Sequence, residues 1–425
     1  MKLLTVLAVI LMPIAAGAQT RIDLVRPDAP QLAARGDHAV GVRTVTLTNP
    51  DVLDIVNVTA DAQPTYDRQL TVEIWYPAQS QDGDTTLTAF LRDGTTEVEL
   101  QGQAVRDAEA VSGRFPLVIL SHGYPGNRYL MSHLGDNLAS KGYIVASIDH
   151  ADSIYSDLGA FGSTLYNRPV DQLFVLDTLL GENSPVVGQV EPDQAVIVGY
   201  SMGGYGALIA AGAGVTQTSV DYEWGTPQGL LGRHLAGSDS HEALSDDRLT
   251  AIVAIGPWGR NRAFWDADGL SNIQIPTLVI AGGVDDVSEY DNGLRPIFEE
   301  MTGTDRHLLT FENANHNAAA PYPAAMESWP MSEALGFAPF EHYADAVWDQ
   351  TRMNNITQHF VTAFLDQHLK GMEDRASYFD LVEVSTDGVV ALDDAGEQTD
   401  AHTYWQGFAP RTAVGLRMEH RAQGD

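Results

Sequence analysis

The sequence predicts an α/β fold with a mostly parallel sheet of eight strands and helices on both faces. Short apolar runs rich in β-branched residues recur along the chain, as in strands that are buried on both faces. Segments with helical patterning lie between these runs, which is typical of parallel strands joined by crossover helices. The first two predicted strands alternate between apolar and polar residues, as half-exposed antiparallel edge strands do.

The predicted elements follow in order along the chain. The two alternating strands span residues 42–47 and 70–76, and the parallel series spans 117–120, 143–148, 195–198, 251–255, 277–281 and 308–311. The predicted helices span residues 129–141, 169–180, 202–213, 292–301 and 353–370. The last helix is followed by Gly371, a residue type that commonly ends helices.

Residues 1–18 have the features of an export signal. Lys2 precedes an apolar run over residues 3–12, and the small residues of 16–18 follow it, so we expect cleavage after Ala18. The alternative is a membrane anchor, but about ten apolar residues are well short of the ~20 that cross a bilayer. The expected product, residues 19–425, is a single domain exported to the periplasm or the medium, with no stable membrane insertion.

Two long insertions interrupt the alternation of strands and helices. They span about residues 214–249 and 317–350, and a C-terminal extension begins at about residue 372. The insertions carry aromatic residues, including Trp224 and Trp329. Long connections in a compact domain often form lids or substrate-binding walls, which would also cover these aromatic side chains. The alternative is that both insertions only pack on the surface.

The composition narrows the possible functions. The chain has 57 acidic and 24 basic residues, a formal net charge of −33, which repels nucleic acid and anionic lipid. This charge suits either a salty medium, where ions screen the repulsion, or an ordinary acidic soluble protein. The chain contains no cysteine, so disulfides, thiolate metal sites and cysteine nucleophiles are excluded.

One pentapeptide supplies a candidate nucleophile. Gly199-Tyr200-Ser201-Met202-Gly203 lies between a predicted strand and a predicted helix. A sharp turn at this junction leaves no room for a β-carbon two residues before or after the serine, which explains the two glycines. The turn exposes the Ser201 hydroxyl beside the N–H groups of the following helix.

An acid and a histidine follow Ser201 in the chain. A serine hydroxyl needs a base and an orienting acid to act as a nucleophile. The turn at 282–286 contains Asp285 and Asp286, and His316 follows the last predicted strand, so all of them belong to the edge of the sheet where ligands bind. Asp285 is the preferred acid, because the form Ala-Gly-x-x-Asp is common in this turn, and Asp286 is the alternative.

Two backbone amides are expected to stabilise an oxyanion, which needs preorganised N–H donors. One is the amide of Met202, at the start of a helix. The other is the amide of Tyr124, in the Ser-His-Gly-Tyr-Pro-Gly turn at 121–126 that follows the third predicted strand.

Four further side chains are candidates for a substrate wall: His122, His150, Tyr155 and Tyr200. The segment at 149–152, Asp-His-Ala-Asp, also suggests metal ligands, but two well-placed ligands are too few for zinc or calcium. We therefore expect no metal and no cofactor.

These motifs resemble the α/β-hydrolase superfamily, in which the acid and the histidine follow the serine in this order. The chain is similar to bacterial dienelactone-hydrolase-like and platelet-activating-factor-acetylhydrolase-like carboxylic ester hydrolases over residues 40 to 415. The motifs that carry the resemblance are Leu-Ser-His-Gly at 120–123, Asp-His at 149–150, Gly-Tyr-Ser-Met-Gly-Gly at 199–204, Ala-Gly-x-x-Asp at 281–285 and Asn-His at 315–316.

The chain departs from two related groups. Dienelactone hydrolases proper use a cysteine nucleophile, so their lactone substrate does not carry over to Ser201. Bacterial cutinases and polyester hydrolases are similar around 123–124 and 201–204, but they are shorter, more open and commonly disulfide-bonded.

The ordered residues and the resemblance predict an exported serine esterase. It would hydrolyse a small-molecule or lipid-like ester through an acyl-enzyme, without a nucleic-acid partner and in an oligomeric state that the sequence does not specify. The alternatives within enzymes are a lipase or cutinase-like polyester hydrolase and an acyltransferase. A non-catalytic binding module is a further alternative, although such modules normally lack the nucleophile, the acid or the histidine.

Overall fold

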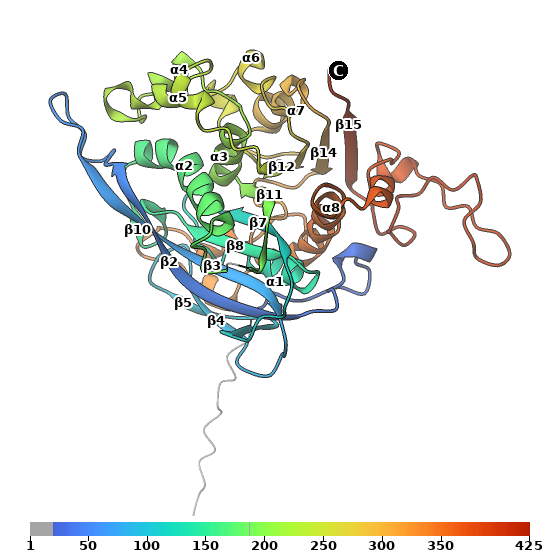
Figure 1. Cartoon of the computed structure of the whole chain (residues 1–425). Coiled ribbons are helices and arrows are strands. Elements are labelled where there is room, and N and C mark those ends of the chain that lie inside the picture. Colours follow the sequence, from blue (N-terminus) through green and yellow to red (C-terminus); the bar gives the residue numbers. More distant parts are fainter. Residues whose placement is uncertain (1–19, 187) are drawn as a thin grey trace, which may run out of the picture.

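A ten-stranded mixed sheet forms the centre of the molecule, in the order β15-β14-β13-β12-β11-β7-β8-β3-β2-β6. The computed structural model describes residues 20–186 and 188–425 (Figure 1). The expected export signal at 1–18 lies outside the described residues.

All eight predicted strands lie in this sheet. They are β2 (Ala39–Leu53), β3 (Thr65–Ala78), β7 (Phe115–Ser121), β8 (Ile144–Asp149), β11 (Val190–Tyr200), β12 (Leu249–Ile255), β13 (Thr277–Gly282) and β14 (Arg306–Phe311). Neighbouring strands from β8 through β7 and β11 to β14 pair in parallel, whereas β2 with β3 and β3 with β8 pair antiparallel. In Figure 1 the long strands β2 and β3 curve along one side of the sheet.

The sheet has two more strands than the eight predicted. β6 (Ala104–Arg106) pairs in parallel with β2, and β15 (Leu416–Arg421) pairs antiparallel with β14, so each forms one edge. Three residues are too few to show a periodic pattern, and β15 reads Leu-Arg-Met-Glu-His-Arg. Edge strands carry such charged residues because one side faces solvent, which makes them hard to recognise in a sequence.

Helices cover both faces of the sheet, as predicted. α1 (Ser132–Ser140) and α8 (Gln350–Lys370) pack on one face, and α2 (Phe161–Leu180), α3 (Met202–Ala210) and α7 (Arg295–Glu300) pack on the other. Successive residues of β7 alternate between these two cores: Val118 and Leu120 join the first, and Leu117 and Ile119 join the second. The continuous apolar run of this strand therefore reflects burial on both faces.

α2 begins at Phe161, eight residues before the predicted start. Pro169 favours the first turn of a helix, but here it lies inside α2. The preceding turns are held by burial, since Leu165 and Arg168 are almost fully buried. Tertiary packing thus extends this helix beyond its local signal.

Residues 79–114, for which no element was predicted, supply two strands of a separate three-stranded sheet. β4 (Thr86–Phe90) and β5 (Glu97–Gln101) form an antiparallel hairpin, and β1 (Thr20–Arg21) pairs in parallel with β5. A second short hairpin, β9 (Ser153–Ile154) and β10 (Asp157–Leu158), follows β8.

The insertions contain only short elements. The first holds α4 (Gln217–Val220), η2 (Pro227–His234) and α5 (Asp239–Glu242), and the second holds η5 (Met326–Ser328) and η6 (Pro339–His342). The remaining short helices are η1 (Gln31–Ala33), η3 (Arg260–Arg262), α6 (Ala267–Leu270), η4 (Tyr290–Leu294), η7 (Glu373–Tyr378) and η8 (Ser385–Asp387). Trp224 and Trp329 are 67% and 60% exposed. The expectation that the insertions cover these two side chains is therefore wrong.

The C-terminal extension packs against α8 and then returns to the sheet as β15. Its buried Trp405 and Phe408 belong to the same core as Phe360 and Phe364 of α8. Within the part of the chain that the structure describes, no helix has the length and apolar character needed to cross a membrane.

Candidate active site

Ser201 lies at a sharp turn between β11 and α3. Its φ of 52° and ψ of −109° are outside the conformations that residues with a β-carbon usually adopt. A β-carbon on Gly203 would lie 1.9 Å from the carbonyl oxygen of Ser121, and one on Gly199 would lie 2.2 Å from the carbonyl oxygen of Gly203. Close backbone approach therefore requires both glycines of the pentapeptide.

A continuous chain of hydrogen bonds joins Ser201, His316 and Asp285. The distance from Ser201 Oγ to His316 Nε2 is 3.0 Å, and the distance from His316 Nδ1 to Asp285 Oδ2 is 2.7 Å. The carboxylate can only accept, so this geometry favours the tautomer with its proton on Nδ1. His316 Nε2 is then free to accept the proton of the Ser201 hydroxyl.

The carboxylate of Asp285 is fixed from its other side. Its Oδ1 accepts hydrogen bonds from the amides of Val287 and Ser288, at 2.9 and 2.8 Å, and its side chain is fully buried. Asp286 is exposed, and its amide donates to Asn315 Oδ1 at 3.0 Å. The structure thus brings Asp285, rather than its neighbour, to the imidazole.

The two expected oxyanion donors lie beside the serine. Tyr124 and Met202 line the same cavity as Ser201, and neither backbone amide donates a hydrogen bond to any other described residue. A β-carbon on Gly123 would lie 3.3 Å from Cβ of Ser201, so the turn that carries Tyr124 packs directly on the serine. Two N–H groups without a partner among the described residues therefore lie on the two turns that meet at Ser201.

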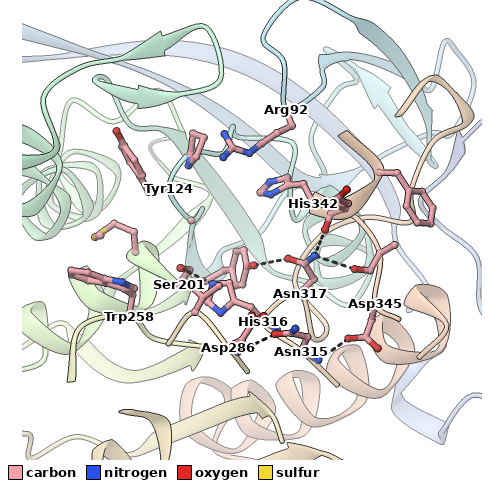
Figure 2. Close-up of a pocket in the computed structure, with 18 of the residues that line it drawn as sticks. Arg92, Tyr124, Ser201, Trp258, Asp286, Asn315, His316, Asn317, His342 and Asp345 are labelled. Carbon is pink, nitrogen blue, oxygen red and sulfur yellow. Dashed lines mark hydrogen bonds between the residues drawn. The ribbon is translucent and has the colours of Figure 1, made fainter. Parts of the chain in front are cut away.

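Ser201 opens into a cavity of about 630 Å³ (Figure 2). Aromatic rings form one wall: Phe161 packs edge to face against Tyr124 and Trp258, with ring centroids 5.1 and 5.5 Å apart. The second insertion supplies another wall through Phe337, Phe340, His342 and neighbouring residues. Among the described residues of the first insertion, none lines this cavity.

Of the four predicted wall residues, only Tyr200 reaches the cavity. Its ring packs on that of His316, with centroids 5.3 Å apart, and its hydroxyl donates to Asn317 Oδ1 at 3.2 Å. Burial raises the pKa of Tyr200, so its hydroxyl stays a hydrogen-bond donor. Tyr155 lies behind the wall instead, where its hydroxyl contacts His342 Nε2 at 2.8 Å.

His122 and His150 are buried beneath the cavity rather than on its wall. His150 Nε2 lies 2.8 Å from Ser121 Oγ, and His150 Nδ1 lies 3.0 Å from Asp171 Oδ2. His122 Nδ1 donates to the carbonyl of Gly123 at 2.7 Å. Burial lowers the pKa of His150 to about 3 and that of His122 well below its usual value, so both histidines serve as neutral supports of the turn at 121–126.

The acids of the segment 149–152 also have partners within the protein. Asp149 pairs with Arg128, and Asp152 pairs with Arg68 at 2.8 Å. Across residues 20–186 and 188–425, no group of three or more metal-ligating side chains is placed to hold an ion.

The residues of the cavity that were not predicted include Arg92, Trp258 and His342. Trp258 follows β12 at the same edge of the sheet as Ser201 and His316. Ligands bind at the carboxyl ends of parallel strands, so its position after a predicted strand could have indicated it. Arg92 lies in the β4–β5 hairpin. The pair Asp93-Gly94 between two alternating segments is a sequence pattern that indicates such a hairpin. His342 lies in the second insertion, and no local sequence pattern predicts where that segment runs in the fold.

Parts of this chain match two family models and several known ester hydrolases. The model of the PET hydrolase-like family matches residues 101–223 and 213–332, and that of platelet-activating factor acetylhydrolase isoform II matches residues 34–159. Cutinase est1 of Thermobifida alba is 23% identical over 204 residues, 47% of this chain and 53% of the cutinase. Bis(hydroxyethyl) terephthalate hydrolase of Streptomyces coelicolor is 24% identical over 205 residues, 48% of this chain and 51% of that protein.

The chain thus spans about half the length of these curated relatives. Among solved structures, a ferulic acid esterase from Streptomyces cinnamoneus superimposes with a TM-score of 0.55 and 21% identity, over 81% of this chain and 94% of that protein. This likeness confirms the predicted α/β-hydrolase fold.

Proposed function

This chain belongs to the PET hydrolase-like family, and from that premise we propose that it is a serine carboxylic ester hydrolase that acts through an acyl-enzyme. The observation that carries the proposal is the chain of hydrogen bonds from Ser201 through His316 to Asp285, at the base of a cavity and beside two unpaired amides. A nucleophile, a base, an orienting acid and an oxyanion site are the parts that acyl transfer needs.

The proposed acylation begins as His316 Nε2 takes the proton of the Ser201 hydroxyl while Oγ bonds to the ester carbonyl carbon. The carbonyl oxygen gains the electron pair and is stabilised by the amides of Met202 and Tyr124. Asp285 stabilises the imidazolium that forms. Collapse of the intermediate breaks the bond to the alcohol oxygen, which leaves with the proton held by His316.

The proposed deacylation repeats these steps with water. His316 removes a proton from the water molecule as its oxygen attacks the acyl carbon. The second intermediate releases the carboxylic acid and returns the proton to Ser201 Oγ. An alcohol in place of water would give a transferase product, so product analysis with competing alcohols measures the balance between the two reactions.

Labelling by a fluorophosphonate tests the proposal, because this reagent phosphonylates an activated serine. We expect one label on the peptide that contains Ser201, loss of that label in Ser201→Ala, and parallel loss of activity on short p-nitrophenyl esters. Ser121 provides an internal control, since it has a similar Ser-His-Asp arrangement but is fully buried. Labelling at Ser121, or a folded protein that neither labels nor turns over, would contradict the proposal.

A polyester hydrolase is the second candidate. The family match and the cutinase and terephthalate-ester hydrolase relatives favour it, whereas the second insertion adds a wall to the cavity at Ser201. Release of soluble products from an insoluble polyester film, at a rate comparable to that on a soluble diester, would support this candidate. Activity confined to the soluble diester would favour the esterase.

We also propose that the protein is exported, on the strength of the signal-like residues 1–18. The mature protein should then begin at Gln19. Mass spectrometry of the N-terminal peptide from the expressing cells checks this, and an intact Met1 peptide on the functional protein would contradict it.

A further inference from the structure

Arg92 is a cationic side chain in a cavity otherwise lined by neutral and acidic residues. It lies at the turn between β4 and β5, outside the main sheet, and borders the cavity that contains Ser201 and His316. Figure 2 shows it beside Tyr124 and His342. A peripheral hairpin thus brings one arginine to the site.

The guanidinium of Arg92 has no partner among the residues that the structure describes: it takes part in no hydrogen bond and no ion pair, in a chain with 57 acidic residues. The adjacent carboxylate of Asp93 is committed to the turn, where it accepts from the amides of Thr95 and Thr96 at 3.0 and 2.9 Å. Arg92 is half-buried on the lining of the cavity, so its N–H groups are available to an anionic ligand.

The hairpin that carries Arg92 is fixed in place. The amide of Leu91 donates to the carbonyl of Thr96 at 2.9 Å, and Asn127 Nδ2 donates to the carbonyl of Phe90 at 3.0 Å. A β-carbon on Gly94 would lie 2.4 Å from the carbonyl oxygen of Tyr155, so the tip packs closely on the body of the protein. The backbone that carries Arg92 is therefore positioned before any ligand arrives, which lowers the entropy cost of binding.

The charge of Arg92 acts on the cavity and is not cancelled there. Burial, and after it the Arg92 charge, lower the pKa of His342 to about 3. The labelled acids of the cavity, Asp286 and Asp345, lie on the opposite side from Arg92 in Figure 2. Asp345 is already bound by the amides of Asn315 and Trp348, at 2.7 and 2.8 Å. A third acid of the lining, the exposed Glu341, directly precedes His342 in the chain, and Arg92 pairs with none of the three.

We propose that Arg92 binds a carboxylate of the substrate, so that the preferred substrates are esters that carry a free carboxylate away from the scissile bond. This inference rests on the proposed esterase function and specifies its substrate class. An arginine matches a carboxylate with two parallel N–H···O bonds. The carboxylate belongs to either the acyl or the alcohol half, and the experiment separates the two.

Matched ester pairs test this proposal. The acyl pair is a monomethyl ester of a dicarboxylic acid and the same ester with a carboxamide in place of the acid. The alcohol pair is the acetate ester of a hydroxy acid and that of its hydroxy amide. In at least one pair we expect kcat/KM to favour the carboxylate roughly 10- to 100-fold, the range of a charge-assisted hydrogen bond.

Variants then assign the preference to Arg92. In Arg92→Gln the carboxylate-to-carboxamide ratio should fall to one or below, because Asp286 and the net charge of −33 then repel the anion. Arg92→Lys should retain part of the ratio. Arg114→Gln is the matched control: Arg114 is exposed, outside the cavity and unpaired among the described residues, so the ratio should persist.

Inhibition gives a second measurement on the unaltered protein. A free dicarboxylate should inhibit hydrolysis of a neutral ester more strongly than the matched diamide. Equal inhibition, or equal kcat/KM within both pairs, would overturn the role of Arg92 while neutral esters are still cleaved. Failure to cleave any ester or to label Ser201 would instead overturn the proposed function.

Discussion

At the scale of single residues, the orientation of Asp285 illustrates how neighbouring identical side chains acquire different environments. Both Asp285 and Asp286 follow β13, yet only Asp285 turns inward, where two backbone amides and His316 surround it. Asp286 is exposed on the cavity side. Adjacent residues in a turn point in different directions, so one of the pair orients the imidazole and the other remains in contact with solvent.

Substitution of these acids gives the first prediction. Asp285→Asn should lower kcat by roughly 10³- to 10⁴-fold, because the amide does not stabilise the imidazolium or hold the required tautomer. Asp286→Asn should lower kcat by less than about 10-fold, since its carboxylate lies in solvent. Steady-state kinetics on a short p-nitrophenyl ester measures both, and a larger loss in Asp286→Asn would transfer the role to that residue.

At the scale of elements, the turn between β11 and α3 depends on close contact with β7. The carbonyl of Ser121, at the end of β7, lies where a β-carbon on Gly203 would be. Gly123, two residues later, lies against Ser201 itself. The strand pair β7–β11 thus positions the proposed nucleophile and the proposed oxyanion turn together.

The second prediction concerns this contact. Gly203→Ala should destabilise the protein by about 1–3 kcal/mol or more, because the new methyl group overlaps the backbone of β7, and it should displace Ser201 and abolish ester hydrolysis. Gly232→Ala is the control, since its β-carbon would lie 4.0 Å from the nearest side-chain atom. Denaturant unfolding and ester turnover measure the two variants; equal stability for both would show that the turn can shift to accept the methyl group.

At the scale of the whole molecule, two charge effects act in opposite directions as the pH falls. Protonation of carboxylates reduces the repulsion that comes with a net charge of −33. Several buried histidines oppose this, because burial lowers their pKa: His133, His150, His307, His342 and His359 to about 3, and His234 to about 4. The neutral histidines stabilise the fold above their unfolded pKa of 6.5, and this stabilisation is lost as the pH falls toward 3.

The third prediction isolates one of these histidines. His133 lies in α1, and burial is the one cause that lowers its pKa. Between pH 6.5 and about 3 the unfolded chain binds a proton at this residue and the folded chain does not. The free energy of unfolding of the parent, relative to His133→Met, should therefore fall by up to about 1.4 kcal/mol per pH unit in this window.

Denaturant unfolding at pH 7, 6 and 5, with constant high salt to screen the surface charge, measures this difference. Comparison of parent and variant removes the contribution of the carboxylates, which both share. A difference that does not change with pH would mean that His133 is protonated equally in the folded and unfolded chains.

Local patterns account for much of the fold. Apolar runs located the six strands of the parallel series, because strands covered on both faces must be apolar at every position, and alternation of apolar and polar residues located β2 and β3. The pentapeptide around Ser201 located the strand-to-helix turn, because the sharp turn itself requires Gly199, although the contact that requires Gly203 comes from β7. Charged edge strands and the entry of α2 before Pro169 were not predicted, since pairing and burial with distant segments stabilise them.

The sequence by itself therefore established the fold class, the order of serine, acid and histidine, and the edge of the sheet at which they lie. The tertiary structure alone placed Arg92 and His342 in the cavity, and buried His122 and His150 beneath it. The physical reason is the range of the forces involved. Periodicity and turn sterics act over a few residues, whereas the cavity joins side chains that lie more than 200 positions apart, whose contacts arise only when the whole chain packs.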